Sequence, residues 1–347
     1  MRFLNKIKNS RFWKIFFGVL LVIYTVAVAL YAWIFVGTVE PAENITWGVN
    51  FSDWQAEQLG LDWKETYTTL LDEGGVRHVR IPIYWNELEA EQNVYDFSKW
   101  DWQLDELEKR GGKAILAVGY KLPRWPECRI PEWFSDPDPQ NLGFTKELFQ
   151  MIRVVVNHYK DHPAVEAWQV ENEPLLVFGV CPETDPDVLD LEIELVRQLD
   201  PSRPVIVTDT GEWSIWYEAG KRADIVGSTL YRVIHDPTIG YVEYDFIEPR
   251  FYAQRKKILN LWKPNTDVIV TELQAEPWVT VLPLSENSIE TQYATMSPER
   301  FRDTIQFARN TGLDTFYLWG GEWIVWLKEN GHTEIWNEAK ALFEESR

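Results

Sequence analysis

The chain has few of the residues that metal, redox and phosphate sites need. It contains two cysteines and five histidines, and neither type recurs at the spacing of a metal site. No Gly-x-Ser-x-Gly motif is present, and no glycine-rich phosphate loop follows a predicted strand. We therefore expect no metal, no cofactor and no serine-hydrolase chemistry.

Basic residues are also scarce, with 34 Lys and Arg against 54 Asp and Glu, a formal charge of −20. An acidic surface repels phosphate backbones, so we expect no nucleic-acid partner. Tryptophan, in contrast, is abundant, with 19 residues. Large indoles are rarely fully buried, so the surplus indicates either a tryptophan-rich core or aromatic platforms on which sugar rings stack.

One long apolar run lies near the N-terminus. Residues 1–14 include five basic residues and no acidic one, and residues 15–36 carry no charge. About 22 helical residues cross a bilayer core of roughly 30 Å, whereas the apolar part of a cleaved signal peptide, the alternative, is usually about 7–15 residues. We predict a basic cytoplasmic tail (1–14), a transmembrane helix (15–37), a linker (38–44) and an extracytoplasmic domain (45–347) that contacts the membrane only through this anchor.

From residue 45 the chain alternates apolar β-type runs with amphipathic segments. The predicted strands are 47–51, 76–83, 113–119, 165–170, 204–208, 224–230, 267–271 and 315–319. The predicted helices are 62–73, 100–110, 146–159, 186–199, 213–221, 248–262, 298–310 and 334–344. Eight such units in about 300 residues fit an α/β fold of the (β/α)8 TIM-barrel type. A doubly wound sheet, the alternative, would usually carry a glycine-rich loop after its first strand.

Two of these runs end in a carboxylate. Glu173 follows the fourth run within Glu171-Asn172-Glu173-Pro174, and Glu272 directly follows the seventh. Catalytic groups of barrel enzymes lie at the C-terminal ends of the strands. Two carboxylates that face each other there are the minimum equipment for cleaving a glycosidic bond.

The pattern as a whole resembles glycoside hydrolase clan A, the retaining β-glycosidases built on (β/α)8 barrels. The resemblance rests on Asn172-Glu173 and Glu272, together with Arg80 in the second run, Tyr231 after the sixth and Trp319 closing the eighth. It covers about residues 45–345. Within the clan, the stretch from Gln169 to Glu173 is similar to the β-galactosidases of families 35 and 42, and residues 85–97 look like families 5, 39 and 42. A cellulase of family 5 often has a histidine near the end of strand three, where this chain has Tyr120-Lys121.

The resemblance implies a role for each of these residues. Glu173 would be the general acid/base and Glu272 the nucleophile that forms a covalent glycosyl-enzyme. Arg80 and Tyr231 are suited to hold Glu272 as a carboxylate. Asn172 would bind the 2-hydroxyl of the sugar, and Trp319 would lie beneath its ring. Further residues that we expect around the substrate are Lys121, Trp125, Glu171, Trp278 and Trp323, with Glu276 and Glu322 as weaker rival carboxylates.

The two cysteines, Cys128 and Cys181, both fall in loops after predicted strands. An extracytoplasmic domain permits a disulfide, so we predict that they pair.

The favoured function is hydrolysis of extracytoplasmic oligo- or polysaccharides by double displacement. A transglycosylase would use the same residues and pass the sugar to another hydroxyl. Two non-enzymatic hypotheses compete with these: a glycan-binding protein on the same barrel, and a membrane protein whose outer domain docks a partner.

Overall fold

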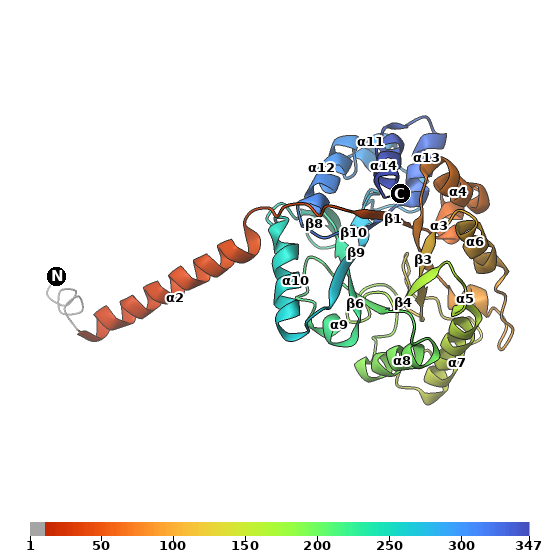
Figure 1. Ribbon diagram of the computed structural model, residues 1–347, viewed down its shortest axis with the longest axis horizontal. Coiled ribbons are helices and arrows are strands. Elements are labelled where there is room, and N and C mark those ends of the chain that lie inside the picture. Colours follow the sequence, from red (N-terminus) through yellow and green to blue (C-terminus); the bar gives the residue numbers. More distant parts are fainter. Residues whose placement is uncertain (1–10, 347) are drawn as a thin grey trace.

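The computed structural model describes residues 11–346 and consists of a barrel with one projecting helix (Figure 1). Residues 1–10, most of the predicted tail, lie outside the described residues. The projecting helix, α2 (Arg11–Phe35), contains a stretch from Trp13 to Phe35 with a mean hydropathy of 2.5 and no buried residue in its most apolar window. Its length and composition fit a membrane anchor and equally a signal sequence.

Eight parallel strands close into a barrel in the order β1-β10-β9-β6-β5-β4-β3-β2 (Figure 1). The predicted (β/α)8 barrel is therefore confirmed, with each predicted strand present. The strands are β1 (Thr46–Asn50), β2 (His78–Pro82), β3 (Lys113–Val118), β4 (Val165–Val170), β5 (Val205–Asp209), β6 (Ile225–Leu230), β9 (Asp267–Gln274) and β10 (Thr315–Trp319).

Side chains from several strands fill the interior of the barrel. Ile115, Ala167, Ile206, Ile269 and Tyr317 form a cluster of their own, separate from the larger core between strands and helices. The strands are thus buried on both faces, which explains why they read as continuous apolar runs. Because the interior is packed, a substrate can approach only at an open end of the barrel.

Helices cover the outside of the barrel (Figure 1). They are α3 (Asp53–Gln58), α4 (Trp63–Thr69) with a π-helical turn (Leu70–Gly74), α5 (Trp85–Leu88), α6 (Ser98–Glu108), α7 (Leu142–Tyr159), α8 (Pro186–Leu199), α9 (Tyr217–Arg222), α10 (Arg250–Trp262), a 3-10 turn (Leu284–Glu286), α11 (Ile289–Tyr293), α12 (Pro298–Arg309), α13 (Gly321–Glu329) and α14 (Glu334–Glu345).

Several elements were not predicted: the short helices α3, α5 and α11, the 3-10 turn, helix α13 and the hairpin of β7 and β8. Helix α13 buries most of its residues, so it lacks the alternation of apolar and polar positions by which an amphipathic helix is recognised. The hairpin of β7 (Val233–Asp236) and β8 (Gly240–Glu243) is short and half-exposed. The predicted helix 213–221 begins only at Tyr217, because Trp216 adopts a left-handed conformation with φ of 60°.

The linker after α2 lies against the domain. Phe35 stacks on Phe251 of α10 with ring centroids 4.9 Å apart. The Gly37 carbonyl accepts a hydrogen bond of 3.0 Å from the Arg250 amide, and the Val39 amide donates to the Asn310 carbonyl at 2.9 Å. The first residues after α2 are therefore fixed to the barrel.

A disulfide joins Cys128, in the loop after β3, to Cys181, in the loop after β4, with Cα atoms 5.0 Å apart. The bond closes a loop between residues 53 positions apart, and cross-links of this kind typically add about 2–4 kcal/mol to the free energy of unfolding. Replacing both cysteines by serine should lower that free energy by this amount, as measured by denaturant titration. Reducing the wild type with dithiothreitol should reproduce the change, and an unchanged midpoint in both experiments would contradict the prediction.

Candidate active site

The segment that follows β4 has an unusual backbone. Glu171 and Glu173 both have positive φ, 57° and 40°, a conformation that costs a non-glycine residue energy and is concentrated at functional sites. Hydrogen bonds to neighbouring strands hold it in place. The Glu173 amide donates to Thr208 Oγ1 of β5 at 2.7 Å, and the Asn172 amide donates to the Lys121 carbonyl at 2.6 Å. The direction of the Glu173 side chain is thus set by tertiary contacts.

Glu272 lies at an irregularity in β9. The pairing of β9 with β6 shifts register between Ser228 and Thr229, and its pairing with β10 shifts over the same part of the strand. A β-bulge changes the face to which the following side chain points. Here the shift accompanies the placement of the Glu272 carboxylate against Arg80 in the barrel mouth.

Arg80 of β2 connects the strands that carry these residues. It is fully buried, and its guanidinium donates to Asn50 Oδ1 (2.8 Å), Gln169 Oε1 (2.7 Å), Asn172 Oδ1 (2.7 Å) and Glu272 Oε1 (2.9 Å). One side chain thereby fixes groups from β1, β4 and β9. Since the amide oxygen of Asn172 is occupied by Arg80, its Nδ2 is the atom left to donate to a ligand.

Tyr231 is the second partner of Glu272. Its hydroxyl donates to Glu272 Oε2 at 3.0 Å. Burial, followed by the negative charges of Glu272 and Glu173, raises the pKa of Tyr231 well above its usual value. The tyrosine therefore keeps its proton and serves as a donor. Each oxygen of Glu272 receives one hydrogen bond, from Arg80 or from Tyr231, and both bonds favour the carboxylate form.

Glu173 has the opposite environment. It is 8% exposed, and burial, followed by the charges of Glu272 and Glu127, raises its pKa well above the usual value, with Lys121 opposing. The same small region thus contains one carboxyl group that keeps its proton and one whose two oxygens accept hydrogen bonds. A carboxyl group with a raised pKa beside one held by two donors is the arrangement expected of an acid and a nucleophile.

Three of the predicted aromatic residues lie at the end of a barrel strand or in a loop that follows one. Trp278 is half-buried and meets Tyr231 edge to face, with centroids 5.7 Å apart. Trp319, also half-buried, has the guanidinium of Arg124 over its ring at 4.1 Å. Trp125 is 48% exposed and lies 6.0 Å from Phe178. Trp125 and Phe178 come from the two loops that the disulfide joins.

Three other predicted residues are buried, and their polar groups are bonded within the protein. Lys121 is buried, and its Nζ donates to the carbonyls of Glu173 (2.8 Å) and Leu176 (2.6 Å), so it supports the loop after β4. Trp323 of α13 is fully buried, and its indole N–H donates to Gln292 at 2.6 Å. The positions of Lys121 and Trp323 after strands did not reveal which groups they would contact.

Glu171 is the third of these residues. It is fully buried and accepts hydrogen bonds from the amides of Tyr120 (3.0 Å) and Lys121 (2.6 Å). Burial, followed by the charge of Glu171, raises the pKa of Glu192 on α8 well above its usual value, so Glu192 keeps its proton and faces Glu171 as a neutral group. The Glu171 carboxylate therefore has the backbone after β3 and a helix as neighbours.

The structure adds charged residues that we did not single out. Arg124 is buried and forms ion pairs with Glu276 and, at 2.7 Å, with Glu322. With Arg80 and Trp319 it borders a narrow hollow at the barrel mouth. Glu127 lies three residues further along the same turn. Arg124 and Glu127 both lie in the loop after β3, within Pro123-Arg124-Trp125-Pro126-Glu127. Because functional groups of barrel enzymes follow the strands, this position could have identified them from the sequence.

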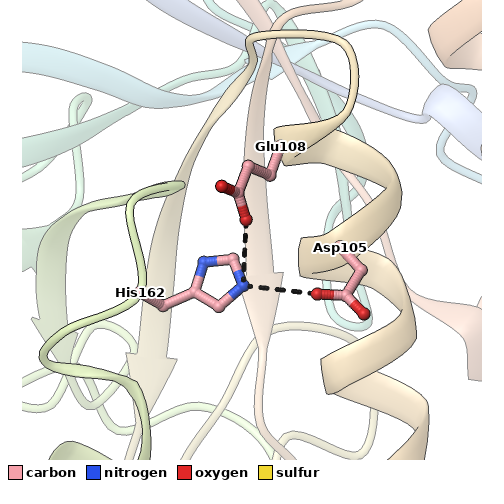
Figure 2. A group of neighbouring side chains, drawn as sticks. All are labelled: Asp105, Glu108 and His162. Atoms are coloured by element: carbon pink, nitrogen blue, oxygen red, sulfur yellow. Dashed lines mark ion pairs between the residues drawn. The ribbon is translucent and has the colours of Figure 1, made fainter.

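Among the described residues, one group of side chains has the proximity of a metal site, and it lies on α6 and the loop before β4 (Figure 2). His162 Nε2 is 3.7 Å from both Asp105 and Glu108. The Ala164 amide donates to His162 Nδ1 at 3.2 Å, so the proton of a neutral ring sits on Nε2 and points to the carboxylates. A proton on this nitrogen faces the two exposed carboxylates, so the group is explained as surface polar contacts between His162 and two acidic side chains.

Comparison with known proteins agrees with this geometry. Residues 50–185 match the model of a family described as beta-galactosidase, Glyco_hydro_42. The beta-galactosidase LacZ of Heyndrickxia coagulans is 30% identical over 127 residues, which are 32% of this chain and 19% of that protein. The chain thus spans about a fifth of the length of the curated relatives that it matches.

Solved structures extend the likeness to most of the barrel. A beta-galactosidase from Halorubrum lacusprofundi aligns with a TM-score of 0.59 at 16% identity, over 86% of this chain and 58% of that one. The exo-beta-1,4-mannosidase Op5Man5 from Opitutaceae bacterium strain TAV5 aligns with a TM-score of 0.57 at 15% identity, over 89% of this chain and 61% of that one. The chain therefore has the (β/α)8 barrel of the clan A glycoside hydrolases, and no single family of the clan accounts for it along its length.

Proposed function

We propose that this protein is a retaining β-glycoside hydrolase. The observation that carries the proposal is the contrast between Glu173, whose proton is retained, and Glu272, whose two oxygens accept hydrogen bonds from Arg80 and Tyr231. Glu272 attacks the anomeric carbon while Glu173 protonates the leaving oxygen. Glu173, now a carboxylate, then activates the water that releases the sugar. No step requires a cofactor.

The other side chains would position the sugar. Asn172 has its Nδ2 free to donate to the 2-hydroxyl, a bond that strengthens in the transition state of retaining enzymes. Trp278 and Trp319 provide aromatic surface beside Glu272. The likeness of residues 50–185 to beta-galactosidases makes β-galactosides the first substrates to test.

We also propose that α2 anchors the enzyme with its barrel outside the cytoplasm. Its apolar stretch of 23 residues from Trp13 is long enough to span a bilayer, and the basic flank at its start favours a cytoplasmic N-terminus. The disulfide supports this placement, since such bonds persist in oxidising compartments. Protease protection of the barrel in sealed, inside-out membrane vesicles would test it, and digestion of the barrel from the exposed cytoplasmic side would contradict it.

The experiment for the activity uses the full chain in detergent with 4-nitrophenyl β-D-galactoside, β-D-glucoside, β-D-mannoside and N-acetyl-β-D-glucosaminide. Proton NMR of the first product reports its anomeric configuration. Release of the β-anomer supports double displacement, because two inversions restore the configuration. Release of the α-anomer, or no hydrolysis by folded protein of these substrates or of β-linked polysaccharides, would refute the proposal. Added sugar acceptors show whether transfer competes with hydrolysis.

A further inference from the structure

A third carboxyl group faces the same region and has no role in the mechanism above. Glu127 is 6% exposed, and its Oε2 is buried without a hydrogen-bond partner among residues 11–346. Lys121 Nζ lies 3.7 Å from this oxygen, which is beyond hydrogen-bond length. Burying an acceptor without a donor costs about 1–3 kcal/mol, so this oxygen would gain from a donor on a bound ligand.

Lys121 connects Glu127 to the catalytic pair, because its Nζ lies 3.7 Å from Glu127 Oε2 and donates to the Glu173 carbonyl at 2.8 Å. Burial raises the pKa of Glu127 to about 7; Lys121 opposes the rise and the charge of Glu272 adds to it. Glu127 in turn contributes to the raised pKa of Glu173. Other groups that act on Glu173 are Lys121 after β3, Glu212 after β5 and Glu272 on β9. Glu173 in turn acts on Tyr231 after β6.

The turn that carries Glu127 is held firmly. The Leu122 amide donates to the Glu127 carbonyl, and the Glu127 amide donates to the Arg124 carbonyl, both at 2.8 Å. Glu127 has a φ of 68°, a conformation that is maintained in non-glycine residues only where surrounding contacts enforce it. The next residue, Cys128, is tied to the loop after β4. The backbone that carries the carboxyl group is therefore fixed in place, which reduces the cost of ordering it around a ligand.

We propose that Glu127 is a specificity-determining residue that accepts hydrogen bonds from hydroxyl groups of the bound sugar. This inference rests on the proposed function, since it assumes that a sugar occupies the space between Glu173 and Glu272. Glu127 takes the place that we assigned to Lys121, whose ammonium group is occupied by backbone carbonyls. It also has an electrostatic effect, because its negative charge helps Glu173 to retain a proton.

The first test compares Glu127→Gln with wild type on 4-nitrophenyl β-D-galactoside across pH. We expect kcat/KM to fall about 10- to 100-fold, the cost of losing a hydrogen bond to a charged group. We also expect the basic limb of the pH profile to move to lower pH, because Glu173 loses a neighbouring negative charge. The control is Glu192→Gln, a buried carboxyl on α8 that faces Glu171, which should leave the basic limb in place.

A second test measures binding without turnover, in the Glu272→Ala background with and without Glu127→Gln. Tryptophan fluorescence follows titration with the same galactoside, and we expect at least tenfold weaker binding when Glu127 is changed. Equal affinity, or an unchanged basic limb accompanied only by a lower Tm, would overturn the inference and show a structural role. If the protein bound the sugar through Glu127 but showed no hydrolysis, the inference about Glu127 would stand and the proposed function would be refuted. Absence of any sugar binding would overturn both.

Discussion

Replacing Glu272 by alanine is expected to lower kcat for β-glycoside hydrolysis by about 10⁴- to 10⁶-fold, the loss seen when a catalytic nucleophile is removed. The physical reason is that no other described carboxylate receives hydrogen bonds from both Arg80 and Tyr231. The truncation also leaves a space beside the anomeric carbon. Azide should enter that space and restore turnover, and it should give an α-glycosyl azide because only one displacement takes place.

Glu272→Gln is the matched control for this experiment. It retains the size of the side chain and one acceptor oxygen for Arg80, so it should be inactive and, with no space for azide, should not be rescued. Product analysis by NMR distinguishes the cases. If Glu272→Ala retained more than a tenth of the wild-type rate, another residue would have to be the nucleophile, with Glu276 and Glu322 the next candidates.

Replacing Glu173 by alanine should lower the rate by about 10²- to 10⁴-fold, the usual contribution of general acid catalysis. The loss should depend on the leaving group. It should be large for a disaccharide, whose oxygen needs a proton, and small in the first step for 2,4-dinitrophenyl glycosides, whose leaving group departs unaided. In wild type the rate should decline as pH rises through the raised pKa of Glu173, and this basic limb should disappear in the variant.

Glu171→Gln serves as the control for Glu173, because it lies two residues earlier in the same left-handed segment but contacts the backbone after β3. Any loss that it causes should apply equally to both leaving groups. Steady-state kinetics with the two substrates would show this. An equal loss for both substrates in Glu173→Ala would remove Glu173 from the acid role.

The sequence was informative wherever a short segment determines its own structure. Each barrel strand coincides with a predicted β-type run, and Glu173 and Glu272 follow two of these runs. Contacts between distant segments were not accessible in this way. The stacking of Arg124 on Trp319 joins residues from the two sides of the β1–β2 pair, and the approach of Glu192 to Glu171 depends on how α8 packs.

Register was equally hidden from the sequence. The irregularity in β9 that accompanies Glu272 depends on two neighbouring strands and has no local sequence signal. Trp323 shows that a position after a strand can also mislead. It follows β10 closely, as a substrate-contacting residue would, yet the unpredicted helix α13 carries it into the core. Proximity to a strand end therefore identifies candidates, and packing decides among them.

The cross-link between Cys128 and Cys181 has a consequence for the timing of maturation. The bond secures the turn that presents Arg124 and Glu127 to the loop that follows Glu173. A reducing cytosol keeps thiols unpaired, so a newly made chain would carry these two loops unlinked until it meets an oxidising environment. With the barrel outside the cytoplasm, as proposed, export and oxidation would complete this pair of loops together.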